Sequence, residues 1–265
     1  MESFRLKNIA IVILLLLNGF LLLLLGWQFM QTQEEKAETV RQLHALYTAN
    51  QLELTVPVEK LGAPLDALTL TRNTETEKRM AAKLLGDDVI SLGMGGGIYD
   101  YGSDAGVIHF RAAGSFDGVG LSREVDDPRD FASRFCRDLG YKDMEVTRTG
   151  EETVIAAIQY AADMPVQNCG VILKFRGNTL TAVSGTHVSL ENAVIEEGEL
   201  LSGVTALLRF LDYRNAAGVV CAEVSDISCV YELQGSALRL TPSWQVETDA
   251  HEYLVDCATG EVTRR

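Results

Sequence analysis

The sequence predicts an α+β protein in which a single N-terminal transmembrane helix precedes an extracytoplasmic, two-lobed domain of antiparallel sheets, each with a packed helix. Three observations support this fold class. An uncharged apolar run lies near the N-terminus, many short strand-like segments separated by glycines follow it, and only a few isolated segments have helical periodicity. The length of 265 residues allows one large domain or two small ones.

The apolar run covers residues 9–29 and contains no charged residue. A helix of this length spans about 30 Å, which is the thickness of the bilayer's hydrocarbon core. Because Arg5 and Lys7 precede the run, the positive-inside rule makes residues 1–8 a cytoplasmic tail and places the chain after the anchor, residues 9–30, outside the cell. The run is longer than the apolar part of a signal peptide and lacks a cleavage motif, so we expect a single-pass protein of the cell membrane.

One polar residue, Asn18, interrupts the apolar run, and Gly19 beside it would allow another helix to approach closely. A carboxamide in hydrocarbon is unfavourable unless it finds a hydrogen-bond partner, and such residues often bond across helices. We therefore expect a transmembrane stripe that contacts a partner helix; the alternative is that a single Asn is tolerated. The stripe comprises Ile11, Leu14, Asn18, Gly19, Leu22, Leu25 and Phe29.

Residues 31–50 are predicted to continue from the anchor as a helical stalk. Val40, Leu43 and Tyr47 recur at three- and four-residue spacing and form one apolar stripe. Such a stripe has to be buried against the chain's own domain, a second copy or a partner. We name these three residues as candidate partner contacts.

Residues 51–145 are expected to form the first β-plus-helix lobe. Thr74 and Glu77 have the spacing of a capping box, so a helix is predicted to begin there and to end at Gly86. Short strands separated by glycines follow. Asp127, with a proline directly after it, predicts the start of a second helix.

Residues 146–265 are expected to form the second β-plus-helix lobe. The pair 177–178, Gly-Asn, predicts a hairpin, and a leucine-rich stretch at residues 200–211 predicts a helix, with further strands after it. The segments GVIHFR at 106–111 and GVILKFR at 170–176 resemble each other, and each begins a hairpin that a helix follows. We interpret them as equivalent strands of a repeated unit, with chance similarity as the alternative.

The charge balance argues against a nucleic-acid partner. Lys and Arg number 23 against 37 Asp and Glu, which gives a net charge of -14. Such a field repels polyphosphates unless a basic cluster overcomes it, and the sequence has no cluster of that size.

No residue pattern indicates catalysis, a metal or a cofactor. The glycine run at residues 93–97 lacks the frame of a phosphate-binding loop and is interpreted as a turn. The histidines are scattered and form no metal-binding or general-base motif; they are His44, His109, His187 and His251. We therefore expect no enzyme activity, no cofactor and no small-molecule substrate.

The five cysteines form no CxxC motif. Cys221 and Cys229 would face each other across a short turn, and disulfides are allowed outside the cell. The alternative is that all five are small buried hydrophobic residues. The full set is Cys136, Cys169, Cys221, Cys229 and Cys257.

The C-terminal region carries a resemblance to a known family. It contains Leu-Thr-Pro-Ser-Trp-Gln-Val at 240–246 and a Tyr-Leu-Val-Asp segment at 253–256 that continues to Thr259-Gly260. Together with the anchor, the stalk and Phe116-Asp117-Gly118, this resembles the YycI/YycH (WalI/WalH) family. The ending is also similar to PepSY-type modules.

The resemblance implies a non-enzymatic regulator that associates with the sensor histidine kinase of a two-component system, and possibly with a paralogous regulator, and adjusts its signalling. The PepSY similarity implies an alternative, an extracytoplasmic module that binds a ligand or a peptidase. In that alternative, Trp244 and Tyr253 would line a groove; packing in the core is the more common place for both.

Overall fold

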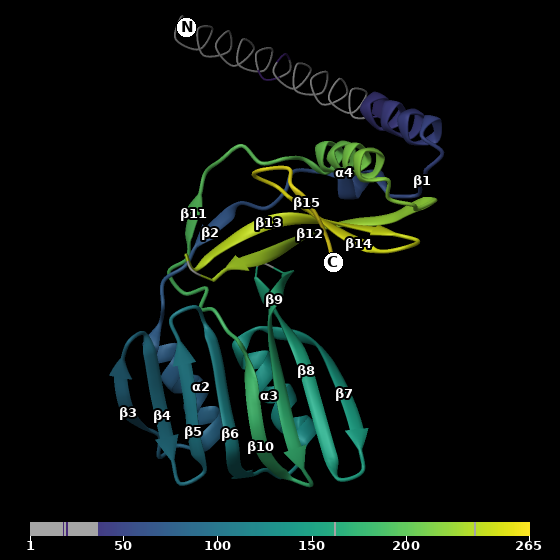
Figure 1. Cartoon of the computed structure of the whole chain (residues 1–265). Coiled ribbons are helices and arrows are strands. Elements are labelled where there is room, and N and C mark those ends of the chain that lie inside the picture. The colour runs from purple at the N-terminus through teal and green to yellow at the C-terminus, as the bar shows by residue number, and fades with distance from the viewer. Residues whose placement is uncertain (1–17, 19, 21–36, 162, 236) are drawn as a thin grey trace, which may run out of the picture.

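The computed structural model describes residues 18, 20, 37–161, 163–235 and 237–265 (Figure 1). The predicted tail and nearly all of the predicted anchor lie outside them. Among the helices of the described residues, none is long and apolar enough to cross a membrane. The α+β class is confirmed, as a large sheet network with helices packed on it, but the network is mixed because β1 and β9 pair with β12 in parallel.

The lower lobe is one antiparallel sheet in the order β3-β4-β5-β6-β10-β9-β8-β7 (Figure 1). Its first strands are β3 (Ile90–Gly95), β4 (Ile98–Ser103), β5 (Gly106–Arg111) and β6 (Ser115–Glu124). The others are β7 (Tyr141–Thr149), β8 (Glu152–Ala161), β9 (Met164–Arg176) and β10 (Thr179–Thr186). The glycine run, predicted as a turn, supplies the β3–β4 turn with its last two residues, since Gly96 and Gly97 adopt φ values of 58° and 80° that favour glycine, while residues 93–95 belong to β3.

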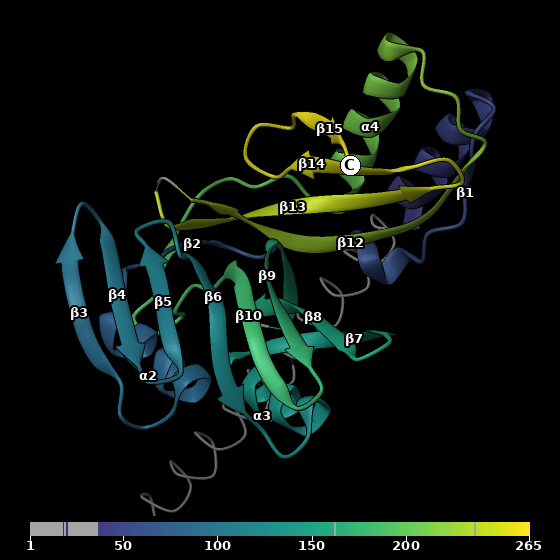
Figure 2. The same cartoon turned by 60° about the horizontal axis from the view of Figure 1, so that its bottom comes forward.

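Two helices, α2 (Thr74–Leu85) and α3 (Pro128–Leu139), cover one face of this sheet (Figures 1 and 2). The predicted Asp127 cap is confirmed, because its carboxylate accepts from two backbone N–H groups of the first turn. The predicted capping box is wrong. The N-cap of α2 is Asn73, whose side-chain oxygen accepts from two N–H groups, and Glu77 turns instead toward Arg72.

The upper lobe contains β12 (Glu223–Gln234), β13 (Arg239–Thr248), β14 (Glu252–Asp256) and β15 (Val262–Arg264). Short strands extend it, namely β1 (Glu53–Leu54), β2 (Ala67–Thr69) and β11 (Val194–Glu196). The helix of residues 37–49, the helix α4 (Gly203–Ala217) and the 3-10 turn η1 (Val58–Leu61) complete it (Figure 1).

The chain repeats one pattern, a helix followed by four strands. The units are α2 with β3–β6, α3 with β7–β10, and α4 with β12–β15. The first two units join edge to edge through β6 and β10. The expected lobe boundary between residues 145 and 146 falls inside β7, so the strands divide between the lobes differently from the expectation. The two similar GVI segments, 106–111 and 170–176, lie in the third strand of the first and second units.

The lobes meet at a compact junction around the start of β9. The side-chain amide of Asn168 donates to the carbonyl of Leu233 at 2.8 Å and accepts from its N–H at 2.7 Å. Gln167 donates to the side-chain oxygen of Gln245 at 2.6 Å. A cluster of buried apolar side chains, which includes Val188, fills the space between them.

Candidate functional site

The residues of the predicted transmembrane stripe are outside the described part of the chain, with one exception. Asn18 is helical and exposed. The remaining six lie outside the described residues: Ile11, Leu14, Gly19, Leu22, Leu25 and Phe29.

The predicted stalk contacts are buried within the chain itself. Val40, Leu43 and Tyr47 belong to the core cluster of the upper lobe. The Tyr47 hydroxyl donates to the backbone carbonyl of Leu207 in α4 at 2.8 Å. The stalk stripe therefore packs on the chain's own lobe, and these side chains are not exposed to another protein.

The two aromatic residues proposed to line a groove are also in the core. Trp244 and Tyr253 are buried, and the Trp244 indole N–H donates to the Leu201 carbonyl at 2.8 Å. Burying these rings while satisfying the indole donor stabilises the upper lobe. Neither ring is free to contact a ligand.

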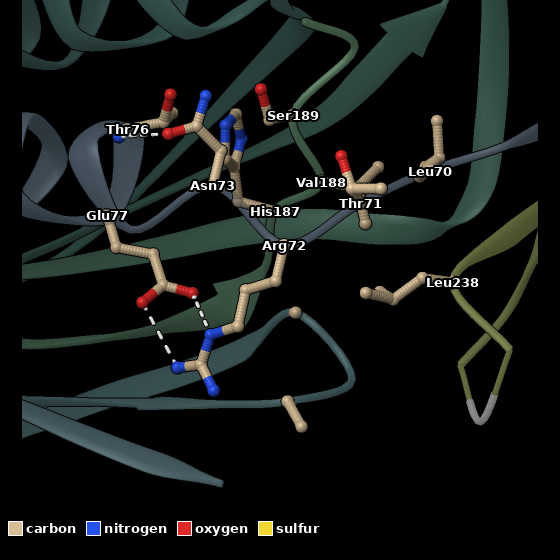
Figure 3. A pocket seen from close by; sticks show the side chains of 12 residues that line it. Leu70, Thr71, Arg72, Asn73, Thr76, Glu77, His187, Val188, Ser189 and Leu238 are labelled. Carbon is tan, nitrogen blue, oxygen red and sulfur yellow. Dashed lines mark hydrogen bonds and ion pairs between the residues drawn. The ribbon is translucent and has the colours of Figure 1, made fainter. Parts of the chain in front are cut away.

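A groove in the lower lobe is the strongest candidate site. Its volume is about 300 Å³, and it lies between α2, the C-terminal end of α3, β8 and the segment 187–191. His187 lines both this groove and a small pocket beside it. Figure 3 shows the small pocket, with His187 between Asn73 and Ser189.

His187 is half-buried, and its imidazole lacks a full set of partners. Its Nδ1 atom has no hydrogen-bond partner among the described residues. Its ring packs against Tyr141, with 5.6 Å between the ring centroids. Burial lowers the pKa of His187 to about 4, because the charged imidazolium would lose its hydration, so the ring is neutral at pH 7.

The backbone on both sides of His187 is held in place. Gln159 in β8 donates to the Val188 carbonyl at 2.6 Å and accepts from its N–H at 3.0 Å. The Tyr141 hydroxyl donates to the Thr186 carbonyl at 2.9 Å. The imidazole is therefore presented from a fixed position.

Two ion pairs border the groove, and in both the cation is on α2. Arg79 in α2 contacts Glu191 at 2.8 Å, and Lys83, one turn later, contacts Asp138 of α3 at 2.5 Å. The hydrogen bonds to these cations lower the pKa of both carboxyl groups. The rim thus offers paired charges of both signs, while the apolar side chain of Leu190 lines the interior.

A third ion pair, beside the small pocket, is structural. Arg72 contacts Glu77 at 2.7 Å, and both side chains are largely buried (Figure 3). The Arg72 guanidinium also donates to the carbonyls of Gly97 and Phe110, and it lies over the Tyr99 ring at 3.9 Å. These contacts tie the start of α2 to the sheet below it.

Sequence reasoning did not single out the His187 groove. The groove depends on Gln159, Tyr141 and α2, which are far from residue 187 in the sequence, so the local pattern around the histidine gave no signal. The sequence also did not indicate the contact between His109 and Asp100, at 2.8 Å. The register of the β4–β5 hairpin brings these two residues together. Among the described residues, no group of three or more His, Cys, Asp or Glu side chains is arranged to hold a metal ion.

All five cysteines are buried and free. The thiol of Cys229 forms a hydrogen bond with Cys257 rather than facing Cys221. This contact lowers the pKa of Cys229, because the partner thiol donates to its thiolate form.

No protein-family model matches the chain, and no curated protein matches it. Solved structures give a distant match. One is the Bacillus megaterium YpeB C-terminal domain, with 10% sequence identity and a TM-score of 0.38, which covers 74% of this chain and 98% of that domain.

Proposed function

We propose that the protein is a membrane-anchored, extracytoplasmic module that binds a peptide segment and acts by binding rather than by catalysis. One observation carries the proposal: a groove of about 300 Å³ is lined by His187, whose buried Nδ1 atom has no hydrogen-bond partner among the described residues. Buried polar atoms are nearly always hydrogen-bonded, so an unsatisfied one at a cavity favours a ligand that supplies the missing bond.

A peptide fits the chemistry of this groove. Its backbone presents N–H and C=O groups in alternation, so it supplies a partner for Nδ1 whichever tautomer His187 adopts. The volume is at the lower end of ligand pockets and accommodates one or two side chains. The ion pairs of Arg79 and Lys83 are exposed, so they exchange readily with charged groups on a ligand.

The location of the groove agrees with a tethered binding module. The groove is in the lower lobe, whereas residues 37–49, which follow the predicted anchor, pack on the far side of the upper lobe (Figure 1). An anchor at residues 9–30 would hold the upper lobe near the bilayer and direct the lower lobe outward. The proposed location is therefore the outer face of the cell membrane, with a cytoplasmic N-terminus.

The experiment is a thermal-shift measurement on the full-length protein in detergent, with a pool of short peptides and with cell-wall fragments as probes. We expect the peptides to raise the unfolding temperature, and His187→Leu to remove the shift. His251→Leu is the matched control because this histidine is exposed and far from the groove. No shift with any probe, or an equal shift in His187→Leu, would refute the proposal.

A second candidate function is regulation of a sensor histidine kinase through the bilayer, as the YycI/YycH resemblance implies. The observation that favours it is Asn18, which is helical and exposed. An exposed carboxamide in hydrocarbon would gain a partner by contacting another transmembrane helix. We expect affinity purification from detergent-solubilised membranes to recover a kinase, and Asn18→Leu to reduce its recovery. Recovery of the kinase unchanged by Asn18→Leu would place the contact elsewhere.

A further inference from the structure

The two edge strands of the lower sheet, β7 and β3, differ in how strongly their side chains oppose pairing with a strand of another chain. The β7 edge carries charged side chains, including Lys142, Glu145 and Arg148, and an irregularity of pairing at Asp143, whose φ is 52°. Charges and bulges on an edge strand prevent it from pairing with another chain. The β3 edge, with the sequence ISLGMG, also has an irregularity of pairing, between Ser91 and Gly93, but it differs from β7 in having no charged residue.

The β3 edge also exposes apolar side chains. Ile90 is 61% exposed and Leu92 is 53% exposed. The strand is last in the sheet order, so among the described residues no strand pairs with its outer side. An uncharged edge strand with exposed apolar side chains is a template for strand addition.

A groove of about 520 Å³ adjoins this edge. Its apolar lining includes Leu85, Ile90, Leu92 and Val107. Gly102 makes room for the Leu92 side chain, because a Cβ atom at this position would lie 2.5 Å from Cδ1 of Leu92. The apolar lining of the groove favours an apolar side chain from a segment paired with β3.

The charged residues that line the groove are mostly acidic. Asp87, Asp88 and Asp104 are exposed at it, and Arg123 is the one cation among its lining residues. The excess of carboxylates favours a basic group on whatever binds there.

We propose that β3 and this groove are a strand-addition site for an extended segment of another extracytoplasmic protein, one that carries alternating apolar residues and a Lys or Arg beside Asp87 and Asp88. Main-chain hydrogen bonds to β3 would supply affinity, and the groove and its carboxylates would supply specificity. The site is separate from the His187 groove, so either proposal can fail without the other.

Charge and size favour such a segment over a second copy of the chain. Two copies, each with a net charge of -14, repel each other. A six-residue edge is also short for burying the roughly 800 Å² per partner of a standard stable interface. The groove lies at the start of β3, at the end of the lower lobe that points away from residues 37–49 (Figure 1), so the bilayer is not the expected occupant.

The probes are two synthetic peptides as long as β3, with alternating valine and threonine and blocked ends. One carries a terminal Lys and the other a Glu at the same position. We expect the Lys peptide to bind the full-length protein in detergent about tenfold more tightly than the Glu peptide by fluorescence anisotropy. Hydrogen exchange should slow in β3 and remain unchanged in β7.

Leu92→Lys should weaken binding of the Lys peptide about tenfold, since it adds an edge charge that opposes pairing. Val119→Lys is the matched control, because Val119 is an 80% exposed apolar residue on β6, an interior strand of the sheet. Asp87→Asn together with Asp88→Asn should reduce the preference for Lys over Glu, and both residues are exposed, so the fold should tolerate the change.

Several results would overturn the proposal. They are no binding of either peptide, equal weakening by Val119→Lys, protection in β7 instead of β3, and an unchanged Lys preference in the Asp87 and Asp88 variant. Protection of β3 that rises with protein concentration in the absence of peptide would also overturn it, because the occupant would then be a second copy.

Discussion

Lowering the pH should destabilise the fold through His187. Burial lowers the pKa of its imidazole to about 4 in the folded protein, from an ordinary value of 6.5. Between these values the unfolded chain binds a proton that the folded chain does not. The contribution of His187 to stability is therefore fully present above about pH 6.5, falls as the pH drops through this window, and is lost below about pH 4.

The size of the effect follows from the two pKa values. A difference of one pKa unit corresponds to about 1.4 kcal/mol, so the loss across the window is about 3 kcal/mol. That is a large part of the stability of an ordinary domain. Protonation of the Glu191 and Asp138 carboxyl groups at the groove also destabilises the fold, because their pKa values are lowered in the folded state. The contribution of His187 must therefore be measured as a difference.

The assay compares the free energy of urea unfolding of the wild-type protein with that of His187→Gln at several pH values between 4 and 7.5. Hydrogen exchange of backbone amides in the lower lobe shows that this lobe unfolds in the transition. The difference in free energy of unfolding between the wild type and His187→Gln should fall by about 3 kcal/mol between pH 7.5 and pH 4. His251→Gln, at an exposed position, is the control. Parallel pH profiles for the wild type and His187→Gln would refute the reasoning, as would an NMR titration of the His187 ring near pH 6.5.

Three further substitutions test contacts of the fold by urea unfolding. Glu77→Gln leaves the largely buried Arg72 guanidinium without its counter-ion and should destabilise the lower lobe by about 2 kcal/mol; a change below about 0.5 kcal/mol would mean that the carbonyl contacts of Arg72 suffice. Tyr47→Phe removes the buried hydrogen bond to the Leu207 carbonyl and should lower stability by about 1–2 kcal/mol, and an unchanged midpoint would show that the residue 37–49 helix is not docked as described. Asp127→Ala removes the N-cap of α3 and should lower stability by about 1 kcal/mol, whereas Asp127→Asn should retain most of it.

The helices were predictable from the sequence because their signals are local. Asp127 and the following proline fix the start of α3, and the leucine-rich stretch from residue 200 overlaps α4. The cap of α2 was misplaced by one residue because Thr74 and Asn73 are both good caps. Asn73 is the cap because Glu77, the partner that Thr74 would need in a capping box, bonds Arg72 instead. The position of Arg72 depends in turn on its contact with the sheet.

The division into sheets was not predictable from local patterns. β6 and β10 pair across more than fifty residues of intervening chain, and this pairing joins two units that each look complete in the sequence. The stalk stripe had the same ambiguity, since periodicity identifies an apolar face but does not say what covers it. The same limit applies to His187, whose burial is produced by Tyr141, Gln159 and α2 together.

The two proposed sites should bind independently, because they share no lining residue. The His187 groove is lined by Thr76, Arg79 and Lys83 of α2, whereas the β3 groove is lined by Leu85 at the end of this helix and by residues that follow it. Substitutions of residues without shared partners are usually additive within about 0.5 kcal/mol. The double variant His187→Leu with Leu92→Lys should therefore lose each binding activity as the corresponding single variant does. A coupling above about 1 kcal/mol would mean that α2 moves as a rigid element between the sites, in which case binding at one site would control the other.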